Sequence, residues 1–193
     1  QMIYLVDMEH PGLVVFPTHR LVRDLPNFDK EAVLEKCSEF FYIDEKEGTD
    51  TMEEDLKKLY DEGKKAFGFY CGKGEWFLLT LKNIDFMSQM LPDVSKASQS
   101  LDVSVLHTLI LEKIFGIDKE NMAKQINLTY TKFFTEAIDG VDKGEFQCSF
   151  VLNPTRVTEI RDVAAAGEKM PQKSTYFYPK MITGMVMNNL GVD

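Results

Sequence analysis

Residues 66–81, AFGFYCGKGEWFLLTL, contain two apolar, aromatic-rich runs on either side of Gly72-Lys73-Gly74. Aromatic residues are enriched in strands, and a short glycine-containing segment between two such runs favours a tight reversal of the chain. The stretch therefore predicts two antiparallel strands joined by a hairpin. It places a sheet at the centre of the predicted fold.

Other segments rich in apolar and β-branched residues predict further strands on both sides of this hairpin. The predicted strands span residues 2–6, 12–16, 40–43, 126–130, 145–153 and 182–187. The acidic stretch over 44–50 is predicted to be a loop. Residues 83–100 are polar and mixed in character, and they are predicted to form a surface connection with one helical turn.

Two helices are predicted before the hairpin from their N-terminal residues. Asp29 is the expected N-cap of a helix over 30–38. Thr51 and Glu54 have the spacing of a capping box, which predicts a second helix that ends near Glu62.

A third helix is predicted from Asp102 to Gly116, because four apolar residues recur there at the helical period. These residues are Val103, Leu106, Ile110 and Ile114. His107 lies within this helix and is interpreted as a histidine at the boundary of the core. Two shorter helices are predicted within 131–144 and over 156–166. Together, the elements predict one α+β unit over residues 1–193, with a mixed, largely antiparallel sheet and packed helices.

The composition excludes several classes of protein. The formal net charge is −9 and the chain has no basic run, so no nucleic-acid partner is expected. No apolar run approaches the roughly 20 residues of a membrane-spanning helix, so no membrane partner is expected. The three cysteines are far apart and form no CxxC pair, which argues against a disulfide scaffold or a metal site and favours a reducing cytoplasm.

Pro17-Thr18-His19-Arg20 directly follows the strand predicted over 12–16. The side chains of Thr18, His19 and Arg20 are expected to emerge where that strand leaves the core. Arginine can hold a phosphate or a carboxylate with its planar fork of donors, and the other two side chains add donors beside it. The alternative is a loop in which Arg20 pairs with an acidic neighbour such as Asp24.

The segment MPQKSTYFYPK, residues 170–180, combines cations, hydroxyls and aromatic rings between two prolines, which favour extended backbone. Such a surface suits an anionic ligand, with a ring available for stacking. The alternative is an edge strand whose lysines are solvated and whose rings fill the core. The candidate binding groups of this segment are Lys173, Ser174, Thr175, Tyr176 and Lys180.

Three stretches together resemble one family of conserved bacterial and archaeal proteins. They are GLVVFPTHRLV at 12–22, LDVSVLHTLILEKIFGI at 101–117 and AGEKMPQKSTYFYPKMITGMV at 166–186. In order and spacing they resemble the C-terminal half of domain of unknown function 1015, and the similarity runs over essentially the whole chain. The N-terminal half of that family carries an Asp-Gly-His-His-Arg run, similar to one in ParB-like domains and in free-serine kinases, and this run is absent here.

The resemblance implies that the chain is the C-terminal domain of a longer protein whose N-terminal half is missing, in agreement with its start at Gln1. It also implies a nucleotide-dependent phosphotransferase, similar to the free-serine kinases, that acts on a small polar metabolite. The residues do not identify a cofactor, and the resemblance implies ATP or ADP with Mg²⁺. The chain alone is then expected to be inactive.

By matching positions, the family's Pro-Thr-His-Arg falls on residues 17–20 and its Lys-Ser-Thr-Tyr run falls on 173–176. The resemblance implies that Arg20 and Lys173 hold a phosphate or a carboxylate, as phosphoryl transfer requires. It implies that His19 positions a hydroxyl or a phosphate oxygen as the catalytic group. The alternative function is a non-catalytic module that senses metabolites or forms a homodimer, in which both motifs are structural.

Overall fold

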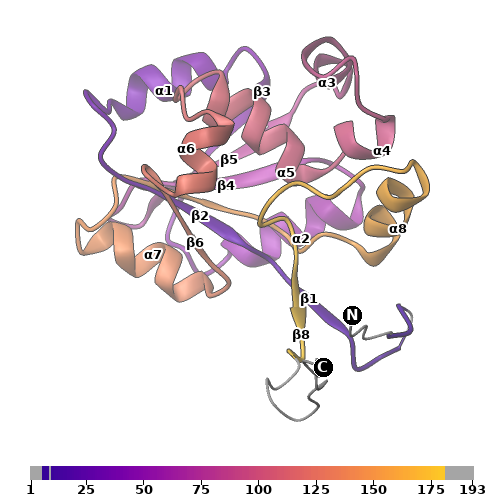
Figure 1. Cartoon of the computed structure of the whole chain (residues 1–193). Coiled ribbons are helices and arrows are strands. Elements are labelled where there is room, and N and C mark those ends of the chain that lie inside the picture. The colour runs from indigo at the N-terminus through magenta and orange to yellow at the C-terminus, as the bar shows by residue number, and fades with distance from the viewer. Residues whose placement is uncertain (1–5, 9, 181–193) are drawn as a thin grey trace, which may run out of the picture.

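A six-stranded antiparallel sheet forms the centre of the computed structural model, which describes residues 6–8 and 10–180 (Figure 1). The strand order is β3-β5-β4-β7-β2-β6, and every neighbouring pair is antiparallel. The bounds of the strands are β2 His19–Val22, β3 Phe41–Glu47, β4 Ala66–Tyr70, β5 Glu75–Leu81, β6 Leu128–Thr131 and β7 Cys148–Val151. The predicted α+β class with a largely antiparallel sheet is confirmed.

The hairpin predicted within residues 66–81 is confirmed by β4 and β5. Its turn residues Gly72, Lys73 and Gly74 have positive φ angles of 102°, 58° and 76°. Glycine adopts such angles without the steric cost that a side chain brings, which explains the two glycines of the turn. All five residues of β4 are buried, and the hairpin occupies the interior of the sheet.

Strand β3 lies at one edge of the sheet and is longer than predicted. The strand expected over 40–43 runs from Phe41 to Glu47, and Glu47 lies opposite Glu75 of β5. The loop predicted over 44–50 is therefore wrong at its first four residues. Charged residues are tolerated in this strand because an edge strand has one side in solvent, and Asp44 and Glu45 are exposed.

Helices cover both faces of the sheet (Figure 1). The principal helices are α1 Lys30–Cys37, α2 Met52–Asp61, α5 Asp102–Val105, the π-helix η1 Leu106–Glu112 and α7 Phe134–Asp142. Helices α2 and α7 share a hydrophobic cluster with Ala66 and Tyr70 of β4, whereas α1, α5 and η1 share a cluster with Phe67 and Phe69. The strand residues alternate between the two clusters because successive side chains of a pleated strand point to opposite faces.

The two predicted helix starts before the hairpin differ in how they are capped. Asp29 caps α1 as predicted, and its side chain accepts a hydrogen bond of 2.9 Å from the Ala32 N–H. Helix α2 begins after Thr51, whose side chain makes no cap bond and lies 3.4 Å from the Asp55 carboxylate instead. The capping box predicted for Thr51 and Glu54 is wrong, because Thr51 has helical backbone angles rather than extended ones.

The helix predicted from Asp102 changes its hydrogen-bonding pattern at Leu106. Helix α5 passes directly into η1, where the Lys113 N–H donates to the carbonyl of Thr108, five residues earlier. Such π-helical turns are wider than α-helical turns and are often found at functional sites. Gly116 lies just beyond this helix with a φ of 71°, close to the predicted end.

Residues 83–100 contain two short helices rather than a surface connection with one helical turn. Met87 is fully buried. Gln99 is also buried, and its side-chain amide is satisfied there because it donates to the carbonyls of Leu91 and Val94 at 2.8 and 3.0 Å. The helix predicted over 156–166 is confirmed, whereas α6 was not predicted. The remaining helices are α3 Asp85–Met90, α4 Lys96–Gln99, α6 Lys119–Lys124 and α8 Val157–Ala165.

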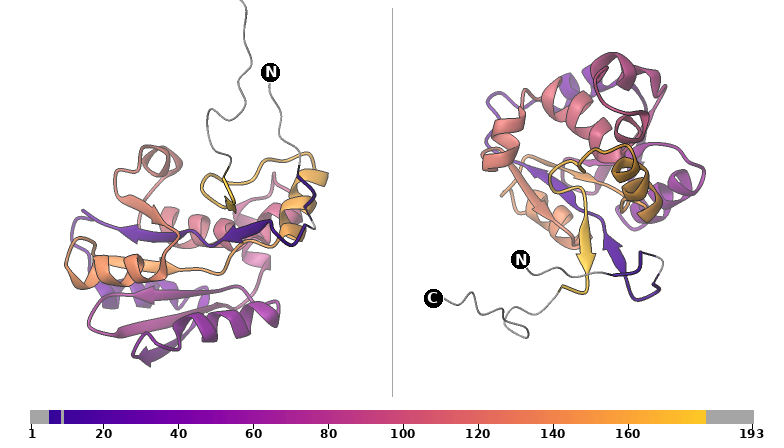
Figure 2. Two further views of the ribbon diagram at one scale, coloured as in Figure 1. Left: turned by 90° about the horizontal axis from the view of Figure 1, so that it is seen from below. Right: turned by 45° about the vertical axis from the view of Figure 1, so that its right-hand side comes forward.

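A separate two-stranded ribbon projects from one side of the molecule (Figure 2). Strand β1 (Val14–Phe16) pairs with β8 (Tyr176–Tyr178), and Phe16 lies opposite Tyr176. The strands predicted over 12–16, 126–130 and 145–153 are thus present as β1, β6 and β7. The strand predicted over 182–187 lies outside the described residues, as does all but one residue of the strand predicted over 2–6.

The three cysteines are free, as the sequence predicts. Cys37 and Cys148 are buried, and burial raises the pKa of Cys37 to about 12. A thiol in such surroundings stays protonated and behaves as a small apolar side chain. Among the helices of the described residues, none has the length and apolar character that a membrane crossing requires.

The two helix starts provide a matched test of the capping geometry. Replacement of Asp29 by alanine removes an N-cap bond and should lower the free energy of unfolding by about 1 kcal/mol. Thr51→Ala should cost clearly less, because Thr51 makes no cap bond. Urea denaturation of both variants measures the difference, and equal losses would contradict the observed capping.

Candidate ligand-binding site

The side chain of Arg20 is fully buried where several distant segments meet. One terminal nitrogen, Nη2, donates to the carbonyl of Lys173 and to Nε2 of His107, both at 3.1 Å. The other, Nη1, donates to the carbonyl of Thr18. The guanidinium therefore joins β2 to the π-helix and to the turn that precedes β8.

The sequence prediction for Thr18, His19 and Arg20 has to be corrected in its local structure. Residues 19 and 20 do not emerge at the end of a strand, because they begin β2, which is buried along its whole length. The alternative pairing of Arg20 with Asp24 is also wrong. Asp24 lies 3.8 Å from the Arg23 side chain instead.

Arg20 and Tyr130 lie directly opposite each other on β2 and β6. The guanidinium carbon is 5.3 Å from the centre of the Tyr130 ring, within the range of a cation–π interaction. Burial lowers the pKa of Arg20 to about 10, so the side chain is still charged at neutral pH. Its Nε and the Tyr130 hydroxyl are buried and have no hydrogen-bond partner among the described residues.

His19 is separated from Arg20 by the pleat of β2. Adjacent strand residues point to opposite faces of a sheet, so the two side chains do not share one site. The Leu152 N–H donates to Nδ1 of His19 at 3.2 Å, while Nε2 has no partner among the described residues. Burial and the nearby charge of Arg20 lower the pKa of His19 to about 4, which keeps its ring neutral.

A hollow of about 300 Å³ brings four of the predicted binding residues together. Thr18 lies between β1 and β2, Tyr176 begins β8, and Lys173 and Thr175 come from the segment just before β8. These four residues are Thr18, Lys173, Thr175 and Tyr176. The convergence of the two motifs, which their separation in sequence leaves open, is therefore a feature of the fold.

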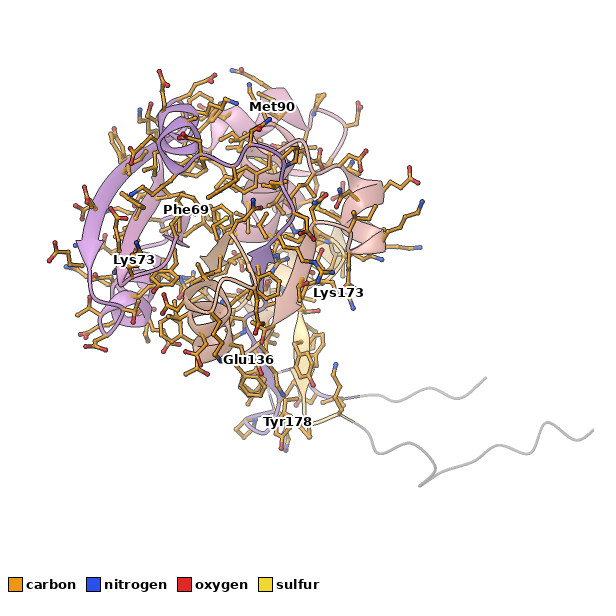
Figure 3. All side chains as sticks on the ribbon, turned by 90° about the vertical axis from the view of Figure 1, so that its left-hand side faces the viewer. Phe69, Lys73, Met90, Glu136, Lys173 and Tyr178 are labelled. Atoms are coloured by element: carbon orange, nitrogen blue, oxygen red, sulfur yellow. The ribbon has the colours of Figure 1, made fainter. Side chains whose placement is uncertain are left out.

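The other two candidates of the 170–180 segment lie next to this hollow. Lys180 places Nζ 4.5 Å from the centre of the Tyr176 ring. Ser174 is buried, its carbonyl accepts a hydrogen bond of 2.9 Å from Thr155 Oγ1, and its own hydroxyl has no partner among the described residues. The alternative of rings that fill the core does not hold for Tyr178, which is exposed at the end of the ribbon (Figure 3).

Lys132 is a cation of the hollow that the sequence did not single out. Its Nζ lies 4.6 Å from the ring centre of Tyr176 and 4.9 Å from that of Phe133. Glu136 is the carboxylate of the hollow, and it accepts a hydrogen bond from the Thr131 hydroxyl. A single lysine between a strand and a helix has no distinctive local pattern, so only the fold reveals its position.

Lys173 adopts a left-handed backbone conformation with a φ of 55°. This conformation is unfavourable for a residue with a side chain and needs support from its surroundings. Here the Lys173 carbonyl accepts the hydrogen bond from Arg20, while its side chain is exposed at the hollow. The buried arginine thus holds the main chain from which the Lys173 ammonium group extends.

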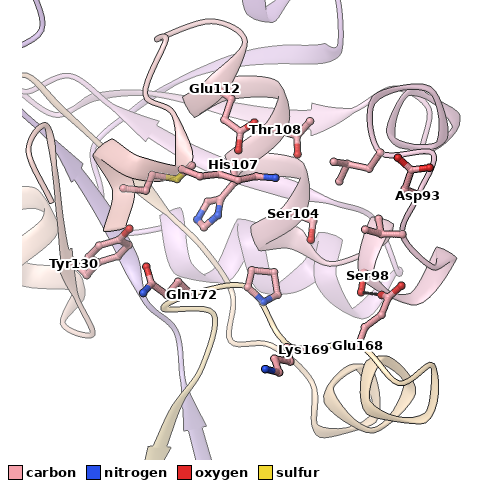
Figure 4. A pocket seen from close by; sticks show the side chains of 15 residues that line it. Asp93, Ser98, Ser104, His107, Thr108, Glu112, Tyr130, Glu168, Lys169 and Gln172 are labelled. Atoms are coloured by element: carbon pink, nitrogen blue, oxygen red, sulfur yellow. Dashed lines mark hydrogen bonds between the residues drawn. The ribbon is translucent and has the colours of Figure 1, made fainter. Parts of the chain in front are cut away.

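A larger cavity of about 660 Å³ (Figure 4) has Tyr130 in common with the hollow. The π-helix contributes His107, Thr108 and Glu112 to its lining, and the segment before β8 contributes Gln172. The sequence interpretation of His107 as a core-boundary residue missed this cavity. The apolar periodicity of residues 102–116 predicts an ordinary helix and contains no signal of the wider turn.

His107 is held neutral by its surroundings. Burial and the charge of Arg20 lower the pKa of His107 to about 3. Because Arg20 donates to Nε2, the ring proton of the neutral imidazole is on Nδ1. Within the described ranges, no group of three or more His, Cys, Asp or Glu side chains is arranged to hold a metal ion.

The family model described as "Protein of unknown function (DUF1015)" matches residues 1–104, which is more than half of the chain. The chain belongs to the DUF1015 family. No curated protein sequence matches it.

Two solved structures share the fold of this DUF1015 chain. A conserved hypothetical protein from Pyrococcus furiosus is 20% identical with a TM-score of 0.50, over 89% of this chain and 59% of that one. A variant of a free serine kinase in complex with ADP is 14% identical with a TM-score of 0.50, over 90% of this chain and 57% of that one. The chain thus spans less than three fifths of the length of either protein.

The two sides of the Arg20–Lys173 contact should respond differently to mutation. Arg20→Ala removes a buried side chain and leaves buried acceptors unpaired, so we expect a loss of about 2–5 kcal/mol of unfolding free energy. Lys173→Ala keeps the carbonyl that Arg20 binds, and its loss should not exceed about 0.5 kcal/mol. Urea titrations measure both values. A loss of several kcal/mol in Lys173→Ala would show that its side chain, not its carbonyl, supports the fold.

His19, which is buried, and His107, which is half-buried, should make the protein sensitive to acid. Their pKa values are about 4 and 3 in the folded protein, against 6.5 for an ordinary histidine. Between the folded and the ordinary pKa values, the unfolded chain binds more protons than the folded chain. The contribution of the two neutral histidines to the free energy of unfolding is therefore complete above about pH 6.5 and is lost as the pH falls.

Each histidine adds up to about 1.4 kcal/mol per pH unit to the slope of the unfolding free energy against pH. We expect His107→Gln to reduce this slope in urea titrations at pH 7, 6 and 5. The exposed His10 gives the control variant His10→Gln. Equal slopes for His107→Gln and the unmodified chain would overturn the expectation.

Proposed function

We propose that this chain forms the ligand-binding part of a nucleotide-dependent phosphotransferase that acts on a small polar metabolite. The observation that carries the proposal is the hollow where Thr18 meets the 173–176 segment. Lys132 and Lys173 line it beside one carboxylate, in a chain whose net charge is −9. A local excess of cations and hydroxyls against an acidic background favours the binding of a phosphate group at this place.

Phosphoryl transfer depends mainly on the positioning of the phosphates and on electrostatic stabilisation of their charge. In the proposed site the ammonium groups of Lys132 and Lys173 supply the charge, and the hydroxyls of Thr18 and Thr175 supply further hydrogen bonds. Arg20 has its terminal nitrogens bound by groups of the chain itself. We therefore assign Arg20 to the support of Lys173 rather than to direct contact with the phosphate.

His19 was expected to position a hydroxyl or a phosphate oxygen. Its side chain points to the face of the sheet opposite Arg20, so we assign it no contact with the phosphate. A magnesium ion that arrives with a nucleotide needs only one or two protein carboxylates. Glu136 is the carboxylate that lines the hollow and fits this requirement. The Mg²⁺ ion would add charge stabilisation to the bound phosphates.

The shared fold with a free serine kinase in complex with ADP supports a nucleotide as the ligand. Because the chain spans 57% of that protein, the proposal includes a further part of the enzyme that supplies the groups for chemistry. A second candidate is a non-catalytic binding or dimerisation module. It is favoured by the projecting β1–β8 ribbon, where Val14 and Tyr178 are 43% and 50% exposed.

Titration calorimetry with ADP and with pyrophosphate tests the proposal. Lys173→Ala should weaken both ligands about 10- to 100-fold, since a charge-assisted hydrogen bond contributes about 1.5–3 kcal/mol. Lys132→Ala should also weaken the binding of both ligands. Lys58→Ala is the matched control, because Lys58 is exposed on α2 and does not line the hollow. Unchanged affinities in both hollow variants would refute the phosphate site, and the absence of binding by the unmodified chain would refute the proposed function.

A further inference from the structure

The larger cavity and the hollow differ in charge although they share a wall. Carboxylates outnumber cations in the cavity, where Asp93, Glu112 and Glu168 face Lys119 and Lys169. In the hollow two lysines accompany one glutamate. The balance of charge therefore favours a phosphate group in the hollow over one in the cavity.

The two spaces are also adjacent at the level of single atoms. Nη2 of Arg20 lies 3.1 Å from the ring of His107, which lines the cavity, and 3.1 Å from the carbonyl of Lys173, which lines the hollow. The linings of the two spaces are therefore neighbours, as a ligand that occupies both of them requires.

We propose that the cavity binds the uncharged nucleoside part of a nucleotide whose phosphates lie in the hollow. This inference rests on the proposed function and adds the location and the chemistry of the second subsite. The cavity volume of about 660 Å³ is in the range of sites that enclose small organic ligands.

The walls of the cavity suit a flat heterocycle with polar edges. Leu91, Val94 and Met122 provide apolar surface for its faces. The hydroxyls of Ser104 and Thr108 each donate and accept hydrogen bonds, as base edges and ribose require. Figure 4 shows His107 and Thr108 on the π-helix, with Tyr130 and Gln172 on a neighbouring part of the wall.

His107 gives this subsite a fixed hydrogen-bonding character. Its Nε2 is occupied by Arg20, so the remaining ring nitrogen is a donor that does not change with pH in the neutral range. A neutral ring beside Arg20 does not attract phosphate. Tyr130 lines both spaces, and its buried hydroxyl has no partner among the described residues.

Gln172 is the most suitable position for a blocking substitution. It lines the cavity but is exposed, so Gln172→Trp can fill the space without disturbing the core. Gln89→Trp is the matched control, since Gln89 is exposed on α3 and does not line the cavity. The probes are pyrophosphate and the four diphosphates ADP, GDP, CDP and UDP, titrated calorimetrically into the 193-residue chain.

We expect the tightest diphosphate to bind more tightly than pyrophosphate. Gln172→Trp should weaken that diphosphate about tenfold or more, a loss of about 1.4 kcal/mol, while pyrophosphate binding is unchanged. Gln89→Trp should change neither. If Gln172→Trp leaves the diphosphate unaffected while Lys173→Ala weakens it, the nucleoside subsite is refuted and the phosphate site stands. If neither pyrophosphate nor any diphosphate binds, the proposed function fails together with this inference.

Discussion

The buried guanidinium of Arg20 is the interaction on which the arrangement of this site depends. An unpaired buried charge is strongly unfavourable, and Arg20 is buried with acceptors for both of its terminal nitrogens. The acceptors come from the entry to β2, from the π-helix and from the turn before β8. These three segments are far apart in sequence, and the requirement for their acceptors brings them to one place. The β1–β8 ribbon, the hollow and one wall of the larger cavity follow from this convergence.

Features that local chemistry determines could be predicted from the sequence. The hairpin at residues 66–81 depends on its own glycines and aromatic runs, and the start of α1 depends on one bond from Asp29 to a residue three positions later. The sequence predictions fail where the structure of a segment depends on a partner that is distant in sequence. Residues 44–47 form a strand because β5 supplies hydrogen bonds, and Met87 is buried because the sheet and its helices enclose it. Local composition indicates a loop or a surface segment in both cases.

The candidate site was predictable in part for a similar reason. The chemistry of Lys173, Thr175 and Tyr176 is visible in the sequence, and the resemblance seen in the sequence pointed to their segment and to the one containing Thr18. Their meeting in one hollow depends on the register of β1 against β8, which sequence patterns do not provide. The pleat of β2 separates His19 from Arg20, and this separation was missed because the two residues were expected in a loop. Lys132 was missed because a lysine after a strand is common.

The π-helix explains how one segment can serve the core and the cavity together. Leu106, Leu109, Ile110 and Leu111 are fully buried, while His107, Thr108 and Glu112 line the cavity. A wider turn changes the spacing at which side chains reach each face, and its hydrogen bonds are less favourable than those of a regular helix. The apolar residues on the core face stabilise this arrangement. The hydrogen bond from Arg20 to His107 then holds the opposite face, so that the same guanidinium that orients Lys173 at the hollow also orients the wall of the cavity. Because one charged group positions both linings, a ligand that spans the two spaces meets surfaces whose relative position is already set before it binds.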